Sequence, residues 1–326
     1  MNERPNSTNE HIHRTVMEAI IARFRESFGD ELRIREPMSR HTTVGLGGPA
    51  DMFLTVRSTA ELIEAVLLAS KQHVDFWVMG AGSNVLVSDQ GVRGLLIRNR
   101  AKHVNYRHDG SSIIVRAESG VTLSRLARDT ASNGLAGLEW AVGIPGTIGG
   151  AVVGNAGAHG GDIATSLRSV SILDADLVVR DYRPDELEYG YRTSILKKDP
   201  STTGKSNRIV LSAEFNLTPA STEELAEIVE SIKEHRKHTQ PPGASMGCMF
   251  KNPEGDFAGR LLEEAGLMGF RIGGAHISPV HANFFVNDDQ ATAEDVRELM
   301  AKAWRQVNRR FRIELEPEVE LIGDWK

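Results

Sequence analysis

The chain has 326 residues, 40% of them hydrophobic and 25% charged, with a formal net charge of −6. That length can bury a substantial core and suggests two domains, and the mildly acidic balance gives no electrostatic reason to expect nucleic acid as a partner. The single cysteine excludes an internal disulfide framework and is compatible with a reducing compartment. Because no stretch approaches the roughly 18 apolar residues of a membrane span, and the polar start lacks the apolar core of a secretory signal, we expect a cytoplasmic protein without membrane insertion.

In chain order, the first predicted elements are a loose tail of about a dozen residues and a helix over 12–28. Further helices are expected over 123–133 and 256–265. Each of these two ends at a glycine, Gly134 or Gly266, the residue type that a left-handed position after a helix favours.

Helices with capping signals are predicted at three other places. In each, a hydroxyl residue stands three positions ahead of an acid, so that the hydroxyl accepts from the helix backbone and the acid reaches back. The pairs are Ser58 and Glu61, Ser221 and Glu224, and Thr292 and Asp295.

Short apolar or β-branched runs alternate with these helices and predict strands. The runs are 76–79, 94–97, 113–117, 170–173 and 209–215. The stretch from Leu211 to Phe215 alternates as a half-buried strand should. Because strands and helices mix irregularly, we expect an α+β fold rather than a strict βαβ repeat. The best domain boundary lies near residues 217–220.

Glycine is dense in three segments of the first half, 41–51, 80–86 and 143–158. Glycine allows positive φ and close approach to a ligand, and successive amides in such turns form a concave site for an anion such as pyrophosphate. Tight turns alone would explain any one segment, whereas three together favour a phosphate-bearing cofactor. The second segment has Val85 where a dinucleotide fingerprint needs its third glycine, so the motif leaves the cofactor unnamed.

Chemistry-bearing residues gather in four later segments, which are 191–194, 247–253, 281–287 and 315–320. Each has a structural alternative, because a lone cysteine is most often an inert core thiol and terminal acids are usually solvated. The histidines lack the spacing of a metal site. No acyl-transfer signature surrounds Cys248.

Taken in order, nine motifs resemble those of the UDP-N-acetylenolpyruvoylglucosamine reductases of peptidoglycan biosynthesis. They are H-T-T-x-G-x-G-G-P-A, G-x-G-S-N-x-L, G-I-P-G-T-I-G-G-A, N-A-G-A, Y-R-x-S, G-x-x-F-K-N-P, A-G-R-L-x-E-x-A-G, H-A-N-F and L-E-x-E-V. The resemblance covers about residues 40–325. The compact segment between the fifth and sixth motifs resembles the shorter branch of the family, which lacks an inserted substrate-covering loop.

The resemblance implies an FAD-binding domain of the vanillyl-alcohol-oxidase, or PCMH, type followed by a smaller α/β substrate-binding domain. We expect an N-terminal tail and helix over 1–30, the FAD domain over 31–217 and the C-terminal domain over 218–326. The residues expected to line non-covalent FAD are Gly80, Gly82, Ser83, Asn84, Gly146, Thr147, Gly149, Gly150, Asn155 and Ala156.

The resemblance also implies a reaction, in which NADPH reduces the enolpyruvyl group of UDP-N-acetylglucosamine enolpyruvate through FAD to give UDP-N-acetylmuramate. Arg192 would stabilise the developing enolate-like charge and Glu318 would polarise the same carboxylate end as an acid. Cys248 stands where the family usually carries a serine that donates a proton. The residues expected to contact substrate or nicotinamide are Tyr191, Lys251, Asn252 and Asn283.

The departure at Cys248 is chemically plausible. A thiol ionises near pKa 8.5, far more readily than an aliphatic hydroxyl, so it is a competent proton donor at neutral pH. We expect no obligate protein partner. Two alternatives stay open: an FAD oxidase or dehydrogenase acting on a sugar or hydroxy acid without NADPH, and a non-catalytic flavin binder in which Cys248 marks lost activity or senses redox state.

Overall fold

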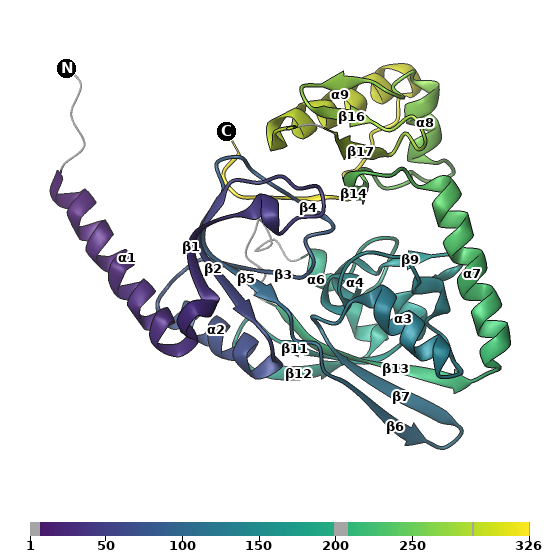
Figure 1. Cartoon of the computed structure of the whole chain (residues 1–326), viewed down its shortest axis with the longest axis horizontal. Helices are drawn as coiled ribbons and strands as arrows, with labels where there is room; N and C mark the ends of the chain where they lie inside the picture. The colour runs from purple at the N-terminus through teal and green to yellow at the C-terminus, as the bar shows by residue number, and fades with distance from the viewer. Residues whose placement is uncertain (1–6, 199–207, 289, 326) are drawn as a thin grey trace.

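The computed structural model describes residues 7–198, 208–288 and 290–325. Figure 1 shows a large lobe built from the elements that precede residue 220, a smaller C-terminal lobe above it, and the long helix α7 (Thr222–Thr239) running along one side between them. Helix α1 (Ser7–Phe28) projects from the large lobe (Figure 1). The architecture is α+β, which confirms the predicted fold class.

The expected loose tail is wrong from Ser7 onward, because α1 begins there. Apolar residues at positions 12, 16, 20 and 24 keep a helical spacing, which favours continuing the helix toward the N-terminus. The first six residues lie outside the described part of the chain.

The first sheet of the large lobe has the strand order β1-β2-β5-β3. Its strands are β1 (Leu32–Pro37), β2 (Pro49–Val56), β5 (Val92–Asn99) and β3 (Phe76–Met79). Strands β2, β5 and β3 are parallel, whereas β1 is antiparallel to β2. Helix α2 (Thr59–Lys71) packs its apolar stripe on this sheet. The glycine loop begins directly after β3 and therefore lies at the carboxyl end of that strand.

The second sheet is antiparallel, in the order β12-β11-β13-β7-β6, and the short strand β8 pairs with β13. Its strands are β12 (Val179–Tyr182), β11 (Leu167–Leu173), β13 (Ile209–Pro219), β7 (Ser112–Glu118), β6 (Val104–Asp109) and β8 (Leu135–Ala136). Helices α3 (Leu123–Ser132) and α4 (Ile148–Gly154) share its core. The predicted strands therefore all exist, although several are longer than expected.

Strand β13 is not the half-buried strand that its alternating sequence predicts. Leu211, Ser212 and Ala213 are all at most 4% exposed. Leu211 belongs to the core under α2, whereas Ala213 belongs to the core under α3. A strand paired on both edges between two cores has no solvent side, and its sequence pattern cannot reveal this.

The smaller lobe is a sheet in the order β14-β17-β16-β15, covered by two helices. The elements are β14 (Ala244–Cys248), β17 (Phe284–Asn287), β16 (Ala275–Ile277), β15 (Arg271–Ile272), α8 (Ala258–Glu264) and α9 (Ala293–Phe311). Gly134 and Gly266, which follow α3 and α8, have φ of +67° and +73°, as predicted for these positions. In the described residues no helix has both the length and the apolarity to cross a membrane.

Short elements complete the chain. They are β4 (Val85–Val87), β9 (Gly157–Ala158), β10 (Gly161–Asp162), α5 (Ile163–Ser166), α6 (Ile195–Lys198), β18 (Glu320–Ile322) and the 3-10 turns Gly29–Glu31, Met38–Arg40, Glu139–Ala141 and Pro184–Leu187. The hydroxyl part of the three predicted caps is confirmed, since Ser58, Ser221 and Thr292 accept from the amides three residues on. Of the three, only the cap at Thr292 has the acid reaching back to the N-cap amide, and Glu61 accepts from the Arg57 amide instead.

Helix α7 packs on the large lobe although it follows the predicted domain boundary. Its buried residues Leu225, Val229 and Ile232 belong to the same core as α3. The helix then ends at Thr239, just before β14 begins the smaller lobe. Residues late in α7 are therefore placed rigidly beside the junction of the lobes.

Residues 316–322, called here the C-terminal strap, connect the lobes a second time. The amide of Glu318 donates to the Met249 carbonyl at 2.9 Å, and the Glu316 carbonyl accepts from the Lys251 amide at 2.8 Å. Farther along, the Glu320 amide donates to the Asn84 carbonyl at 3.0 Å, and β18 pairs in parallel with β4. The strap is thus hydrogen-bonded to the smaller lobe at one end and to the large lobe at the other.

A carboxylate of the large lobe caps a helix of the smaller one. Asp89 accepts from the amides of Ala293 at 2.9 Å and Glu294 at 3.0 Å, the first two residues of α9. Thr292 caps the next amide through its hydroxyl. An acid at a helix N-terminus satisfies unpaired amides and complements the helix dipole, so Asp89 holds the two lobes in one arrangement.

We predict that Asp89→Ala lowers the free energy of unfolding by about 1–2 kcal/mol, because two amides at the start of α9 lose a charged acceptor. The thermal unfolding midpoint measures this. Asp129→Ala is the control, since Asp129 pairs with Arg125 at 3.4 Å on the surface and such pairs contribute at most about 1 kcal/mol. An Asp89→Ala midpoint equal to that of the wild type would contradict the capping role.

Candidate active site

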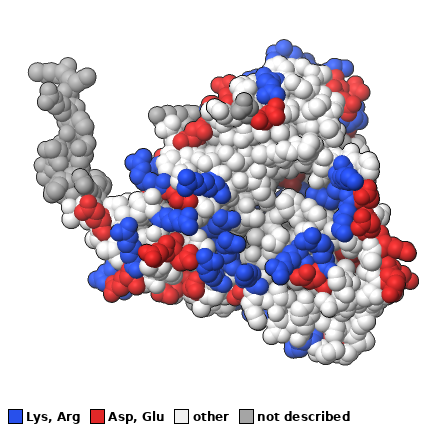
Figure 2. Space-filling view, viewed as in Figure 1, with Lys and Arg blue, Asp and Glu red and all other residues white. Residues whose placement is uncertain are grey.

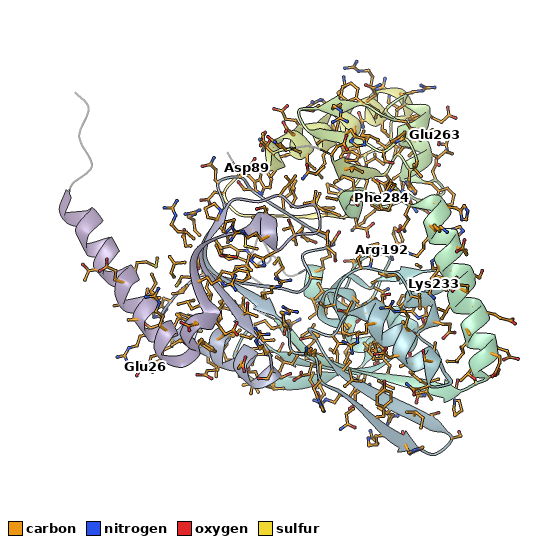
Figure 3. All side chains as sticks on the ribbon, viewed as in Figure 1. Glu26, Asp89, Arg192, Lys233, Glu263 and Phe284 are labelled. Atoms are coloured by element: carbon orange, nitrogen blue, oxygen red, sulfur yellow. The ribbon has the colours of Figure 1, made fainter. Side chains whose placement is uncertain are left out.

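A hollow lies where the two lobes meet, and Figure 2 shows it with Lys and Arg side chains on both sides. In Figure 3, the labelled Arg192 of the large lobe lies directly below the labelled Phe284 of the smaller lobe. Phe284 is the strand partner of Cys248. The predicted catalytic residues therefore come from opposite sides of this junction.

Arg192 is held in a strained turn and paired with an acid. Gly190 and Thr193 exchange backbone hydrogen bonds of 3.1 and 3.3 Å around it, and its own φ is +56°, a left-handed value that is uncommon outside glycine. Its Nε lies 3.1 Å from Oε1 of Glu318, and its Nη2 donates to the Gly157 carbonyl at 2.6 Å. The turn thus aims a fixed guanidinium at the strap.

Glu318 lies on the strap with its side chain 20% exposed. Burial raises the pKa of this carboxyl, while the positive charges of Arg192, Lys197 and Lys251 oppose the rise. Since the pKa of Glu318 is raised on balance, its protonated form is favoured relative to an ordinary glutamic acid. An acid in this state can donate a hydrogen bond to a ligand carboxylate.

Cys248 closes β14 at an irregularity in the pairing with β17. Burial raises the pKa of its thiol to about 12, and the Glu318 carboxylate adds to this, while the guanidinium groups of Arg192 and Arg236 and a hydrogen bond from Asn283 act in the opposite sense. The thiol is therefore protonated at neutral pH. The structure brings the three predicted catalytic residues into one electrostatic cluster.

The residues predicted to contact substrate surround this cluster. The Lys251 ammonium lies 2.5 Å from Oε1 of Glu316. The Tyr191 hydroxyl accepts from the Asn252 amide at 3.4 Å, which links the Arg192 turn to the loop after Cys248. The Arg192 guanidinium also lies over the Tyr191 ring, 5.2 Å from its centroid.

Asn283 differs from its neighbours because it is only 1% exposed. Its Nδ2 donates to the Phe250 carbonyl at 2.8 Å and its Oδ1 accepts from the Phe250 amide at 2.9 Å. Both atoms therefore fix the backbone beside Cys248. Its contact with substrate stays a prediction.

The two predicted cofactor loops pack against each other at their glycines. A Cβ on Gly80 would lie 2.3 Å from Oγ1 of Thr147, and one on Gly146 would lie 3.1 Å from Oγ of Ser83. A Cβ on Gly150 would meet nothing within 4 Å, so that glycine faces open space. Because Gly80 and Gly146 have no side chain, the two loops can approach each other closely. Gly150 leaves the second loop accessible.

The amides of the first loop fit a phosphate group. Ala81, Gly82, Ser83 and Asn84 donate no backbone hydrogen bond to any acceptor in the described ranges. Successive amides without a partner, in a turn with Gly82 at φ +68°, are the kind of donors from which an anion-binding nest is built. The residues present therefore fit the diphosphate of a dinucleotide such as FAD, and this fit does not depend on a complete dinucleotide fingerprint.

Two amide side chains that were predicted to line the cofactor also hold the protein together. Asn84 donates from Nδ2 to the Glu318 carbonyl at 3.0 Å. Asn155, with φ +44°, donates to the Gly190 carbonyl at 3.1 Å and accepts from the Ala164 amide at 3.0 Å. Asn84 thus connects the first cofactor loop to Glu318, and Asn155 connects the second to the turn that holds Arg192. A direct contact of either side chain with the cofactor stays a prediction.

The remaining predicted cofactor residues lie on α4 and its ends. Thr147 is the N-cap residue of α4 and is 7% exposed. Gly149 packs on Ser119, whose Cβ would lie 3.1 Å from a Cβ at that position. The Ala156 amide donates to the Ala151 carbonyl at 2.9 Å. In the part of the chain that the structure describes, no three His, Cys, Asp or Glu side chains gather to hold a metal ion.

A buried polar group behind the first loop escaped the sequence analysis. The His41 ring contacts Glu36 at 2.9 Å through Nε2 and Arg98 at 2.6 Å through Nδ1. Burial lowers the pKa of His41, so this imidazole stays neutral. A Cβ on Gly82 would lie 2.2 Å from the His41 carbonyl oxygen, so this cluster supports the loop from below. The pairing joins residues 57 positions apart, and the motif around His41 gave no signal for it.

Comparisons with known proteins agree on one family. The family model for an FAD binding domain matches residues 50–180, and that described as UDP-N-acetylenolpyruvoylglucosamine reductase, C-terminal domain, matches residues 237–322. A protein of the latter name from Rubrobacter xylanophilus is 44% identical over 89% of this chain and 94% of its own. One from Bacillus subtilis is 37% identical over 94% of this chain and 99% of its own.

A solved structure agrees with these relatives. The crystal structure of UDP-N-acetylenolpyruvylglucosamine reductase from Thermus caldophilus is 37% identical, covers 90% of this chain and 100% of its own, and superposes with a TM-score of 0.74.

We predict that Glu318→Gln speeds the alkylation of Cys248 by iodoacetamide several-fold at about pH 9, where a carboxyl group is ionised. Removing this negative charge lowers the pKa of the thiol and raises the thiolate fraction, which is the reactive species. Mass spectrometry of the chain, which has one cysteine, measures the rate. Glu314→Gln, at an exposed position nearby, is the control, and equal rates in both variants would contradict the predicted charge coupling.

Proposed function

The chain belongs to the UDP-N-acetylenolpyruvoylglucosamine reductase family, and we infer that it is an FAD-dependent oxidoreductase that uses NADPH to reduce UDP-N-acetylglucosamine enolpyruvate to UDP-N-acetylmuramate in peptidoglycan synthesis. The observation that carries this inference is the convergence of Arg192, Glu318 and a protonated Cys248 thiol from both lobes beside the glycine loops. Family membership favours this reaction over an NADPH-independent oxidase or a non-catalytic flavin binder.

The cofactor assignment rests on the fit of the two loops. FAD, when bound, supplies the hydride transfer, and the protein supplies position and electrostatics. We assign the diphosphate to the unused amides of residues 81–84. The other residues that would line the cofactor are Gly80, Gly146, Thr147, Gly149, Gly150, Asn155 and Ala156.

Arg192 and Glu318 would bind the enolpyruvyl carboxylate. A guanidinium is a rigid donor for a carboxylate, and here its direction is fixed by the turn and by the Gly157 carbonyl. Because burial raises the pKa of Glu318, this carboxyl takes up a proton more readily than an ordinary glutamic acid when a ligand carboxylate arrives. The pair then stabilises the negative charge that develops next to the carboxylate during reduction.

Cys248 would deliver the proton to the carbon that bears the carboxylate. The thiol holds its proton at neutral pH, and an enolate-like carbon is basic enough to take it. The resulting thiolate lies near the guanidinium groups of Arg192 and Arg236, which favour the charged form. The same charges that oppose the high thiol pKa therefore stabilise the state formed by proton transfer.

The loop after Cys248 would hold the sugar nucleotide. Lys251 and Asn252 place a cation and an amide beside the thiol, and Tyr191 joins this loop to Arg192. We assign these groups to the diphosphate end of the substrate and Asn283 to positioning the loop. We assign FAD binding to residues 31–217, and substrate binding to residues 218–326 together with Tyr191 and Arg192 of the large lobe. We place the reaction in the cytoplasm, because a free thiol is compatible with a reducing compartment. We propose no obligate protein partner.

The visible spectrum of the purified protein tests this function. Flavin absorption bands should bleach on anaerobic addition of NADPH and return on addition of the enolpyruvyl sugar nucleotide. A protein that holds FAD but never bleaches with NADPH, or one whose reduced flavin is reoxidised by oxygen and not by the sugar nucleotide, would contradict the proposal.

The proton-donor role of Cys248 predicts that two variants behave differently. Cys248→Ala should keep NADPH-driven bleaching but slow reoxidation by substrate about 100-fold or more, since general acid catalysis contributes that much. Cys248→Ser should keep substantial turnover. Anaerobic stopped-flow spectroscopy follows each half-reaction. Full-rate reoxidation of the alanine variant would rule out a donor role for the thiol.

A further inference from the structure

Arg236 is a half-buried cation in the last turn of α7 that lacks an acidic partner. Its Nη2 donates to Oε1 of Gln240 at 2.7 Å, and no carboxylate of the described residues forms an ion pair with it. Burial lowers the pKa of Arg236, the direction expected of a cation that loses water without gaining an acid. Taking a charge out of water is costly unless a counter-charge replaces it.

The neighbouring cations of α7 do not share this situation. Lys233 lies 3.0 Å from Glu230, and Lys237 lies 3.9 Å from Glu234 with its side chain 75% exposed. They are ordinary surface pairs of a helix. Arg236 thus differs from them in both burial and partners.

A glycine of the second cofactor loop makes room for this guanidinium. A Cβ on Gly143 would lie 2.5 Å from Nε and 2.6 Å from Cδ of Arg236. Gly143 also has φ +79°, and its amide donates to the Ser124 hydroxyl at 2.7 Å. The first glycine of the G-I-P-G-T-I-G-G motif is therefore the surface on which Arg236 rests, which fixes the cation beside the cofactor loop.

Arg236 also acts on the reacting centre. Its charge is one of those that lower the pKa of the Cys248 thiol, so it lies close enough to the thiol to act on its ionisation. Arg192 already has an acid at 3.1 Å, whereas Arg236 has no ion-pair partner among the described residues. Of the two guanidinium groups that act on the thiol, Arg236 is therefore the one whose charge is left for a ligand to balance.

We propose that Arg236 binds an oxyanion of the ligand, a carboxylate or phosphate oxygen, in the space beside Cys248. This inference rests on the proposed function and extends it. Two ligands of the reaction carry such oxygens: the sugar nucleotide, in its enolpyruvyl carboxylate and its diphosphate, and NADPH, in its phosphates. A guanidinium with only an amide partner in the free protein can bind either one without breaking an existing ion pair.

The experiment separates the two half-reactions of the FAD-loaded protein under anaerobic conditions. The variants are Arg236→Gln, which removes the charge, Arg236→Lys, which keeps a charge without the planar fork, and the control Lys237→Gln, which removes a surface charge from the same helix. For each, stopped-flow spectroscopy gives the concentration of NADPH that half-saturates flavin bleaching and the concentration of sugar nucleotide that half-saturates reoxidation.

We expect Arg236→Gln to raise one of these concentrations at least about tenfold, equivalent to about 1.4 kcal/mol, with partial recovery in Arg236→Lys and no change in Lys237→Gln. A rise confined to reoxidation identifies the sugar nucleotide as the source of the oxyanion, and a rise confined to bleaching identifies NADPH. No rise in either, or equal damage to both half-reactions without recovery in Arg236→Lys, would overturn the proposal.

A second readout needs no turnover. Arg236→Gln should slow alkylation of Cys248 at fixed pH relative to Lys237→Gln, because losing a nearby positive charge raises the pKa of the thiol further. An equal alkylation rate in both variants would show that Arg236 does not face the thiol and would overturn the proposal. Wild-type protein that fails to bleach or reoxidise would instead refute the proposed function, and the alkylation result would still stand.

Discussion

The position of the C-terminal strap is the constraint on which the rest of the site depends. Its backbone is hydrogen-bonded to the loop after Cys248 at one end and to β4 at the other, and Asn84 holds the Glu318 carbonyl between them. Glu318 therefore cannot move independently of the cofactor loop or of the thiol. Because Arg192 pairs with Glu318 across the junction of the lobes, this one segment sets the geometry of all three groups.

The electrostatics of the cluster explain why a thiol can occupy the donor position. Burial and the carboxylate of Glu318 keep the proton on Cys248, whereas Arg192 and Arg236 favour the thiolate that forms when the proton leaves. These opposing influences act together on one ionisation equilibrium, and their balance sets how readily the thiol gives up its proton.

Local signals in the sequence predicted the elements well, and tertiary contacts decided the rest. Helix caps such as Ser58 and Thr292 act within three residues, so their sequence pattern was sufficient. The burial of Leu211 on a strand between two cores, and the packing of Arg236 on Gly143, depend on segments far apart in the chain. The motifs gave the residue types around the flavin, but they could not reveal that Asn84 and Asn155 also join the cofactor loops to the catalytic pair.

A crystal structure of the FAD-loaded protein with the enolpyruvyl sugar nucleotide would test this account most directly. We predict that the flavin ring lies against the two glycine loops and that the enolpyruvyl carboxylate contacts Arg192 and Glu318. The Cys248 thiol should lie within reach of the carbon next to that carboxylate. A substrate carboxylate bound away from the strap, with the thiol facing another part of the ligand, would contradict it.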